Sequence, residues 1–140
     1  MNRETIKGRW TVFSWEQVYD DGRIVLPMGT EVEGFIEYSD HGMFCVISKK
    51  DRKEFTTGGQ WSADDAEKAD AYSSYLTYAG GYDVEENTIT HHVNYSIFPN
   101  WVGSTQYRTA DLNGDILTLT TARLEAGTTE ARISKLTFKR

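Results

Sequence analysis

Residues 105–121, TQYRTADLNGDILTLTT, decide the fold of this chain. Two runs rich in threonine, leucine and other strand-forming residues, Thr105–Leu112 and Ile116–Thr121, flank the dipeptide Asn113-Gly114. Asn-Gly is typical of a two-residue hairpin turn, because both central residues of that turn take positive φ angles. The stretch therefore predicts two neighbouring antiparallel strands joined by a tight turn.

The same pattern of short β-rich runs separated by turns continues in both directions from this hairpin. Residues 51–60 are polar and contain glycine, so we expect a loop or a weak edge strand there. The further expected strands are 9–19, 23–26, 34–39, 43–48, 82–85, 88–98 and 132–139. A sheet of about eight to ten strands with hairpin connections must close or split into two layers. We expect an all-β, closed or nearly closed antiparallel barrel.

One segment has the period of a helix. Ser62-Ala63-Asp64-Asp65 resembles a capping box, in which the serine oxygen and an acid three residues later satisfy free backbone amides. Alanine, tyrosine and leucine residues then recur every three or four positions up to Ala79, and Gly80-Gly81 follows as a C-terminal stop. The pattern predicts one short helix over about residues 62–79.

The composition limits the class of protein. A length of 140 residues suits a single domain over residues 1–140, and 39% hydrophobic with 26% charged residues is typical of a globular chain. The net charge of −6 argues against nucleic acid and against an anionic membrane surface as partners. The single cysteine, Cys45, excludes an internal disulfide, and its apolar neighbours predict a small buried side chain.

Several sequence signals are missing, and their absence narrows the expected chemistry. The N-terminal residues form no apolar signal segment, and no run approaches the ~18 apolar residues of a membrane span, so we expect a cytoplasmic protein. The sequence contains no G-x-S-x-G, phosphate-binding glycine loop, Cys-x-x-Cys or His-x₃-His motif. We therefore expect no metal and no cofactor.

Four blocks, in this order, resemble the bacterial and fungal lipocalin-like domain family. They are Gly8-Arg9-Trp10, Thr90-His91-His92-Val93, Phe98-Pro99-Asn100-Trp101-Val102-Gly103 and the Leu112–Leu119 block. The resemblance implies a calycin-type small barrel, in a wider group that contains ligand carriers and some isomerases and cyclases. It also implies that Trp10 packs across the barrel floor, with an arginine of the last strand, Arg132 or Arg140, stacked on it.

Strand alternation predicts which side chains enter the barrel. If Leu112 faces inward, Arg108 and Gln106 on the same strand also face inward. A buried arginine needs a partner. Either Glu16 or a backbone carbonyl pairs with Arg108 as a structural contact, or Arg108 binds a carboxylate, phenolate or carbonyl of a ligand.

The two adjacent histidines must point to opposite faces of their strand, so they cannot share a metal. His91 lies on the apolar face with Tyr95, and His92 lies on the polar face. We therefore expect His91 and Tyr95 inside the barrel, unless a bulge reverses the alternation. His91 is either a hydrogen-bonded core residue or, with a pKa near neutrality, a group that moves a proton.

Three more residues are candidates for the barrel interior. Starting from Trp10, alternation along the first strand places Glu16 inside and Trp15 outside, although the opposite alternation is nearly as plausible. Trp101 follows Pro99-Asn100 in a loop between strands, where an indole can act as a lid or fill the end of the core. Tyr38 is a further candidate for the pocket wall.

These observations favour a protein that binds one small, largely apolar or aromatic molecule with a polar end. Its expected binding residues are Arg108, Gln106, His91, Tyr95, Tyr38 and Trp101. The alternative is a cofactor-independent isomerase, cyclase or dehydratase in the same pocket, with His91, Tyr95 and Glu16 as the catalytic residues. A structural protein with a filled barrel is the third hypothesis. We expect a monomer or homodimer.

Overall fold

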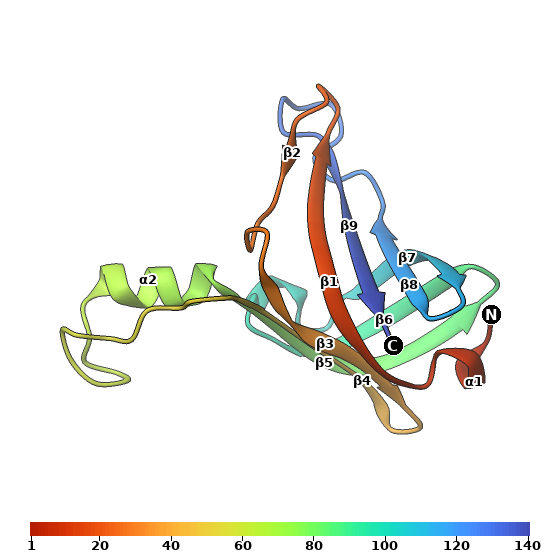
Figure 1. Cartoon of the computed structure of the whole chain (residues 1–140), viewed down its shortest axis with the longest axis horizontal. Coiled ribbons are helices and arrows are strands. Elements are labelled where there is room, and N and C mark those ends of the chain that lie inside the picture. The colour runs from red at the N-terminus through yellow and green to blue at the C-terminus, as the bar shows by residue number, and fades with distance from the viewer.

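The computed structural model describes all residues from Met1 to Arg140, and most of them are in strands (Figure 1). Nine strands follow one another along the chain with two short helices and one 3₁₀ turn. The strands are β1 (Gly8–Tyr19), β2 (Ile24–Val25), β3 (Val32–Ser39), β4 (Gly42–Lys49), β5 (Tyr75–Glu85), β6 (Thr88–Ser96), β7 (Thr105–Asn113), β8 (Ile116–Thr121) and β9 (Arg132–Lys139).

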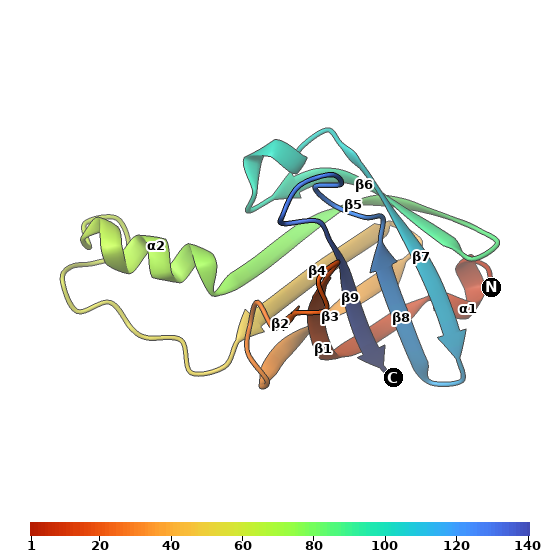
Figure 2. The same cartoon turned by 90° about the horizontal axis from the view of Figure 1, so that it is seen from above.

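The sheet closes on itself through its first long strand. From β3 to β9 each strand pairs antiparallel with the next, and β1 pairs with β3 on one edge and with β9 on the other. At Thr11 the two pairings of β1 meet, because this residue lies opposite Phe35 of β3 and also opposite Lys139 of β9. The short strand β2 pairs only with β1, outside the closed ring. The predicted closed antiparallel barrel is confirmed, and Figure 2 shows its strands around one core.

A bulge in β1 reverses the alternation of inward and outward side chains. Val12 lies opposite Phe138 and Ser14 lies opposite Thr137, so Phe13 is an extra residue, and it is exposed. Trp10 and Val12 face the core before the bulge, but Trp15 faces inward after it. The expectation that Glu16 faces inward and Trp15 outward was therefore wrong.

A second bulge lies in β6. Val93 is opposite Gly80 and Tyr95 is opposite Ala79, so one extra residue separates the two pairs. Tyr95 is turned to solvent and is 75% exposed, which contradicts its predicted place inside the barrel. The bulge requires glycine at position 80, because an added Cβ there would lie 1.8 Å from the carbonyl oxygen of His92.

One end of the barrel is closed by helix α1 (Arg3–Ile6), which the sequence analysis did not predict. Ile6 is fully buried, and its carbonyl accepts a hydrogen bond of 2.8 Å from the Trp10 indole nitrogen. The Arg140 guanidinium stacks 4.0 Å from the centre of the Trp10 ring and donates to the Lys7 carbonyl. Arg140, and not Arg132, is thus the arginine that packs on the floor tryptophan.

The predicted helix exists but is shorter than residues 62–79. Helix α2 spans Asp65–Ser73, and its N-cap is Asp64, whose carboxylate accepts from the Glu67 amide, not the predicted Ser62. The residues after Ser74 pair with β4 as part of β5, because backbone pairing in the sheet overrides their helical spacing. No helix in the protein has the length and apolar composition needed to cross a bilayer.

Residues 50–74, which we call the arm, project away from the barrel (Figures 1 and 2). No residue of α2 is buried, and Trp61 in the preceding loop is 81% exposed. Arg52 fixes the base of the arm by donating to Ser74 and to the Ala71 carbonyl. The arm therefore contributes little to the core of the barrel.

Replacing residues 54–69 by a short Gly-Ser linker is expected to change the free energy of unfolding by less than about 1 kcal/mol, because few buried contacts are lost. Urea denaturation followed by far-ultraviolet circular dichroism measures this change. The variant keeps Arg52 and Ser74, which hold the base of the arm. A loss above about 2 kcal/mol would contradict the independence of the barrel from the arm.

Candidate ligand-binding site

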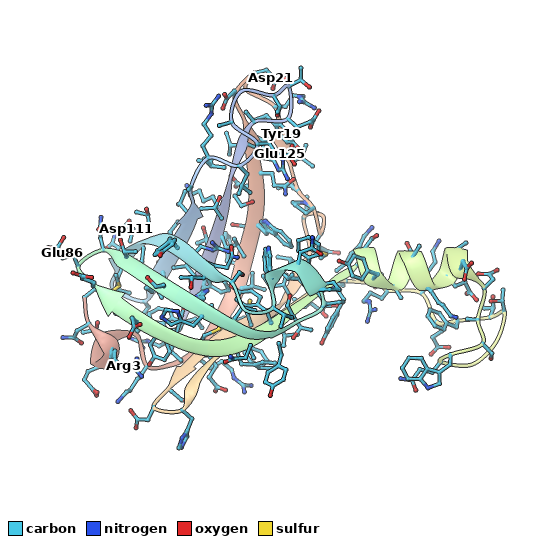
Figure 3. All side chains as sticks on the ribbon, turned by 180° about the vertical axis from the view of Figure 1, so that it is seen from behind. Arg3, Tyr19, Asp21, Glu86, Asp111 and Glu125 are labelled. Atoms are coloured by element: carbon cyan, nitrogen blue, oxygen red, sulfur yellow. The ribbon has the colours of Figure 1, made fainter.

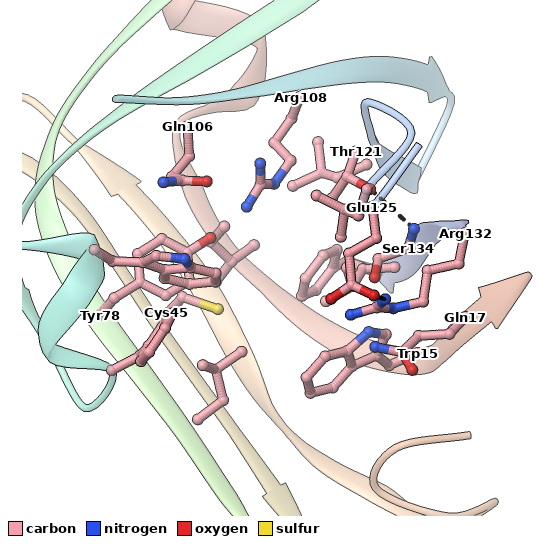
Figure 4. Close-up of a pocket in the computed structure, with 18 of the residues that line it drawn as sticks. Trp15, Gln17, Cys45, Tyr78, Gln106, Arg108, Thr121, Glu125, Arg132 and Ser134 are labelled. Carbon is pink, nitrogen blue, oxygen red and sulfur yellow. Dashed lines mark hydrogen bonds and ion pairs between the residues drawn. The ribbon is translucent and has the colours of Figure 1, made fainter. Parts of the chain in front are cut away.

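A cavity of about 690 Å³ lies in the half of the barrel opposite α1 and reaches the surface at the other end. We call that end the open end. The cavity reaches it between the partly exposed side chains of Tyr72, Phe98 and Leu124. Its wall is mainly apolar, and Figure 4 shows most of it. The apolar part consists of Trp15, Ile36, Cys45, Tyr72, Leu76, Tyr78, Phe98, Trp101, Leu119, Leu124, Leu136 and Phe138.

Arg108 enters this cavity from β7 (Figure 4). It follows the inward alternation of Ala110 and is only 7% exposed. One of its N–H groups donates to the Tyr107 carbonyl at 3.0 Å, and no ion pair in the protein includes Arg108. A backbone carbonyl thus satisfies part of the guanidinium, as one hypothesis expected, but the predicted Glu16 contact does not form.

The groups beside Arg108 are neutral. Burial raises the pKa of the Tyr78 hydroxyl well above its ordinary value, and the nearby Cys45 raises it further. Burial likewise raises the pKa of the Cys45 thiol to about 12, so this thiol is protonated near pH 7. Gln106 also lines the cavity and donates from its amide to Ser104 at 2.8 Å. The charge of Arg108 is therefore not balanced at this end of the cavity.

His91 faces inward, and it lies in the layer beneath the cavity. Its Nε2 is 2.7 Å from the Tyr38 hydroxyl and its Nδ1 is 3.1 Å from the Tyr78 hydroxyl. Burial, followed by the charge of Arg108, lowers the pKa of His91 to about 3. The ring is therefore neutral near pH 7, one nitrogen donating and the other accepting. This lowered pKa contradicts the expected value near neutrality.

The outer face of β6 carries the second histidine. His92 is exposed, and its Nε2 lies 2.7 Å from a carboxylate oxygen of Asp83. The alternation of His91 and His92 therefore follows the sequence pattern, since the bulge begins only after Val93.

The structure separates the predicted site residues into a group in the cavity wall, a group beneath it and a group outside it. The cavity wall contains Arg108, Gln106 and Trp101. The layer beneath the cavity contains His91 and Tyr38. The two residues outside the cavity are Tyr95 and Glu16. The three residues proposed for catalysis, His91, Tyr95 and Glu16, are thus not brought together in the cavity.

Several wall residues were missed by the sequence analysis. Tyr78 was assigned to a helix, although its place opposite Cys45 puts both side chains in the cavity. Trp101 packs edge-on against Tyr78, with ring centres 5.3 Å apart, so it forms wall and not a separate lid. Trp15 was hidden by the bulge at Phe13, which no local sequence signal marks.

The closed barrel, plugged at one end by α1 and open above an apolar cavity at the other, places this protein among the up-and-down β-barrels with an internal cavity. The chain belongs to the family described as lipocalin-like domain, whose model matches residues 7–140.

Two further proteins are similar to this chain. The 4'-hydroxy-3'-methoxypropiophenone carrier protein ppsC of Aspergillus oryzae is 40% identical over 68 residues, which cover 43% of this chain and 61% of that protein. The match thus spans less than two thirds of the relative. An uncharacterized protein from Bacteroides eggerthii has a solved structure with a TM-score of 0.46 at 13% identity, over 96% of this chain and 99% of that one.

Proposed function

We propose that this protein binds one small aromatic molecule inside the barrel and holds the anionic or strongly accepting end of that molecule with Arg108. The observation that carries the proposal is a buried guanidinium that borders an apolar cavity and has no acidic partner. The expected ligand groups are a carboxylate or a phenolate, because both accept the charge-assisted hydrogen bonds that a guanidinium donates.

The energetic cost of Arg108 supports this proposal. A buried charge without a counter-charge destabilises a folded protein, and apolar replacements at such positions are often neutral or stabilising. Residues that lower stability in this way are typical of functional sites. A bound anion would supply the missing counter-charge.

The remaining wall suits an aromatic ring. Tyr78 and Trp101 present one corner of the cavity, and Trp15 presents an indole on the opposite side (Figure 4). A volume of about 690 Å³ lies within the range of about 300–1,000 Å³ that is common for small-molecule pockets. One ring system of the size of naphthalene would fit and bury most of its surface.

The A. oryzae relative supports the same class of ligand. Its name describes a carrier of an aromatic ketone that bears a phenolic hydroxyl and a methoxy group. A phenolic oxygen is one of the two groups that we propose for Arg108. The carrier role is therefore part of the proposal for this chain.

The test is a titration with 2-naphthoate, followed by the fluorescence of the cavity tryptophans. Wild-type protein is expected to bind 2-naphthoate at micromolar concentration and more tightly than 2-methylnaphthalene. Arg108→Met is expected to weaken 2-naphthoate binding by about 10- to 100-fold, because a hydrogen-bonded charge contributes about 1.5–3 kcal/mol. The same variant is expected to unfold at an equal or higher temperature, since the unpaired charge is gone.

Arg9→Met is the matched control, because Arg9 lies on the outer face of β1 and pairs with Glu37. It is expected to leave the affinity for 2-naphthoate unchanged. Equal affinity of wild type and Arg108→Met, or no binding of 2-naphthoate to wild type, would refute the proposed role of Arg108.

A further inference from the structure

We propose that Gln106 selects ligands that carry a hydroxyl group beside their anionic group, because its side-chain oxygen accepts a hydrogen bond from that hydroxyl while Arg108 holds the anion. The ligand class is then the hydroxyaryl carboxylates, with both polar groups on one ring. The inference rests on the proposed function and deepens it by naming a second functional group of the ligand.

A chain of hydrogen bonds fixes the orientation of the Gln106 amide. The Ser104 hydroxyl has a single hydrogen, and it donates this hydrogen to the Trp101 carbonyl at 2.6 Å. Ser104 Oγ can therefore only accept from Gln106, so the group that lies 2.8 Å from it is the amide nitrogen Nε2. The other end of the amide is then Oε1, which is an acceptor and has no hydrogen to donate.

The Gln106 oxygen is unpaired and accessible. The one side-chain hydrogen bond of Gln106 is made by Nε2, so Oε1 accepts none from the protein. Two side-chain atoms without a partner are covered by protein, Trp15 Nε1 and Arg132 Nε, and Gln106 Oε1 is not one of them. Because Gln106 lines the cavity, a molecule inside the cavity can reach this oxygen. Figure 4 shows the oxygen on the side of the amide that faces Arg108.

Arg108 presents the opposite polarity two residues farther along β7. Side chains two positions apart on a strand lie on the same face, with their Cα atoms about 7 Å apart. Arg108 only donates hydrogen bonds, and Gln106 Oε1 only accepts them. A carboxylate has no hydrogen to donate, so it suits Arg108 and is repelled by Gln106 Oε1. This part of the wall therefore matches an anionic group with a proton-bearing group beside it.

A hydroxyl on the ring that carries the carboxylate meets these requirements. A phenolic hydroxyl has a pKa near 10, so it keeps its proton at pH 7 and can donate to Gln106. Two groups in meta positions of one ring can reach both side chains, whereas a hydroxyl on the far ring of a naphthalene cannot. The position of the hydroxyl is therefore part of the inference.

The test compares 4-hydroxy-2-naphthoate with 4-methyl-2-naphthoate by isothermal titration calorimetry. The probes share the carboxylate and have nearly the same shape, since a hydroxyl and a methyl group are similar in size. Wild-type protein is expected to bind the hydroxy probe about fivefold more tightly, which is the usual net effect of one hydrogen bond. The same comparison at position 6, on the other ring, is expected to show no preference for the hydroxyl.

Gln106→Leu is expected to reverse the preference, so that the methyl probe binds about threefold more tightly, because the hydroxyl then enters an apolar site without a partner. Gln106 is only partly buried, and leucine is similar in size, so the variant is expected to fold. Gln17→Leu is the matched control, since it makes the same change on the other side of the cavity wall (Figure 4). It is expected to keep the fivefold preference.

The outcomes separate this inference from the proposed function. Equal or tighter binding of the 4-methyl probe to wild type, or survival of the preference in Gln106→Leu, overturns the role of Gln106 and leaves that of Arg108 intact. Loss of the preference in Gln17→Leu, or an equal preference at position 6, overturns it as well. If none of these naphthoates binds to wild type, the proposed function fails with it.

Discussion

Lowering the pH from 7 to 4 is expected to reduce the free energy of unfolding by about 3 kcal/mol through His91 alone, at a slope that approaches about 1.4 kcal/mol per pH unit below pH 6.5. In the folded barrel the pKa of His91 is about 3, because burial and the charge of Arg108 oppose protonation. In the unfolded chain the ring has its ordinary pKa near 6.5. Between these values the unfolded state binds more protons, so stability is complete above pH 6.5 and decreases as the pH falls toward 3.

Urea denaturation at half-unit pH steps measures this slope. His91→Gln is expected to flatten it between pH 6.5 and 4, because glutamine can donate to one tyrosine and accept from the other without titrating. His92→Gln is the matched control, since His92 is exposed on the outer face. The carboxylates whose pKa is lowered by their hydrogen-bonded partners also lose stability as the pH falls toward 4, but both variants keep them, so the difference between the two slopes isolates His91. Identical slopes in wild type and His91→Gln would contradict the prediction.

Replacing Trp10 by alanine is expected to lower the free energy of unfolding by about 3–5 kcal/mol, the cost of removing a fully buried large aromatic side chain. The indole is inaccessible to solvent, donates to the Ile6 carbonyl and lies under Arg140. Its loss would open the closed end of the barrel and release α1. Because a small barrel has only about 5–15 kcal/mol of stability, Trp10→Ala is expected to unfold at much lower urea concentration.

Two variants control this experiment. Trp61→Ala removes a tryptophan that is 81% exposed on the arm, and it is expected to change stability by no more than about 0.5 kcal/mol. Trp10→Phe keeps most of the packing but loses the hydrogen bond to Ile6, so its stability should lie between wild type and Trp10→Ala. Equal effects of the substitutions at positions 10 and 61 would refute the role of the floor tryptophan.

The strands could be predicted from the sequence because each one has its own β-rich run and its own turn. The hairpin around Asn113-Gly114 forms as expected, and the inward position of Arg108 follows from Leu112 by alternation alone. Alternation within one uninterrupted strand depends only on backbone geometry. For that reason the inward position of Arg108, the residue that we propose for ligand binding, could be predicted without a structure.

The wrong predictions concern positions where the pairing of one strand with its neighbour changes the local geometry. The bulges after Val12 and Val93 each insert one residue, and each reverses every later side chain on its strand. As a result, Trp15 faces inward in place of Glu16, and Tyr95 faces outward. The helix was extended too far because the spacing around Tyr75 and Tyr78 suits a helix, while pairing with β4 makes it a strand.

The double pairing of β1 sets the order in which the barrel can assemble. β1 lies next to β3 at one edge and next to β9 at the other, so its second partner is separated from it by more than a hundred residues of sequence. During synthesis on a ribosome, the hairpins from β3 to β8 can form one after another. The edge of β1 that pairs with β9 stays unpaired during this time. The ring cannot close until residues 132–139 have emerged. Contacts of such long range make folding slow compared with that of helical proteins of equal size, and until the ring closes the free edge of β1 is open to wrong pairing.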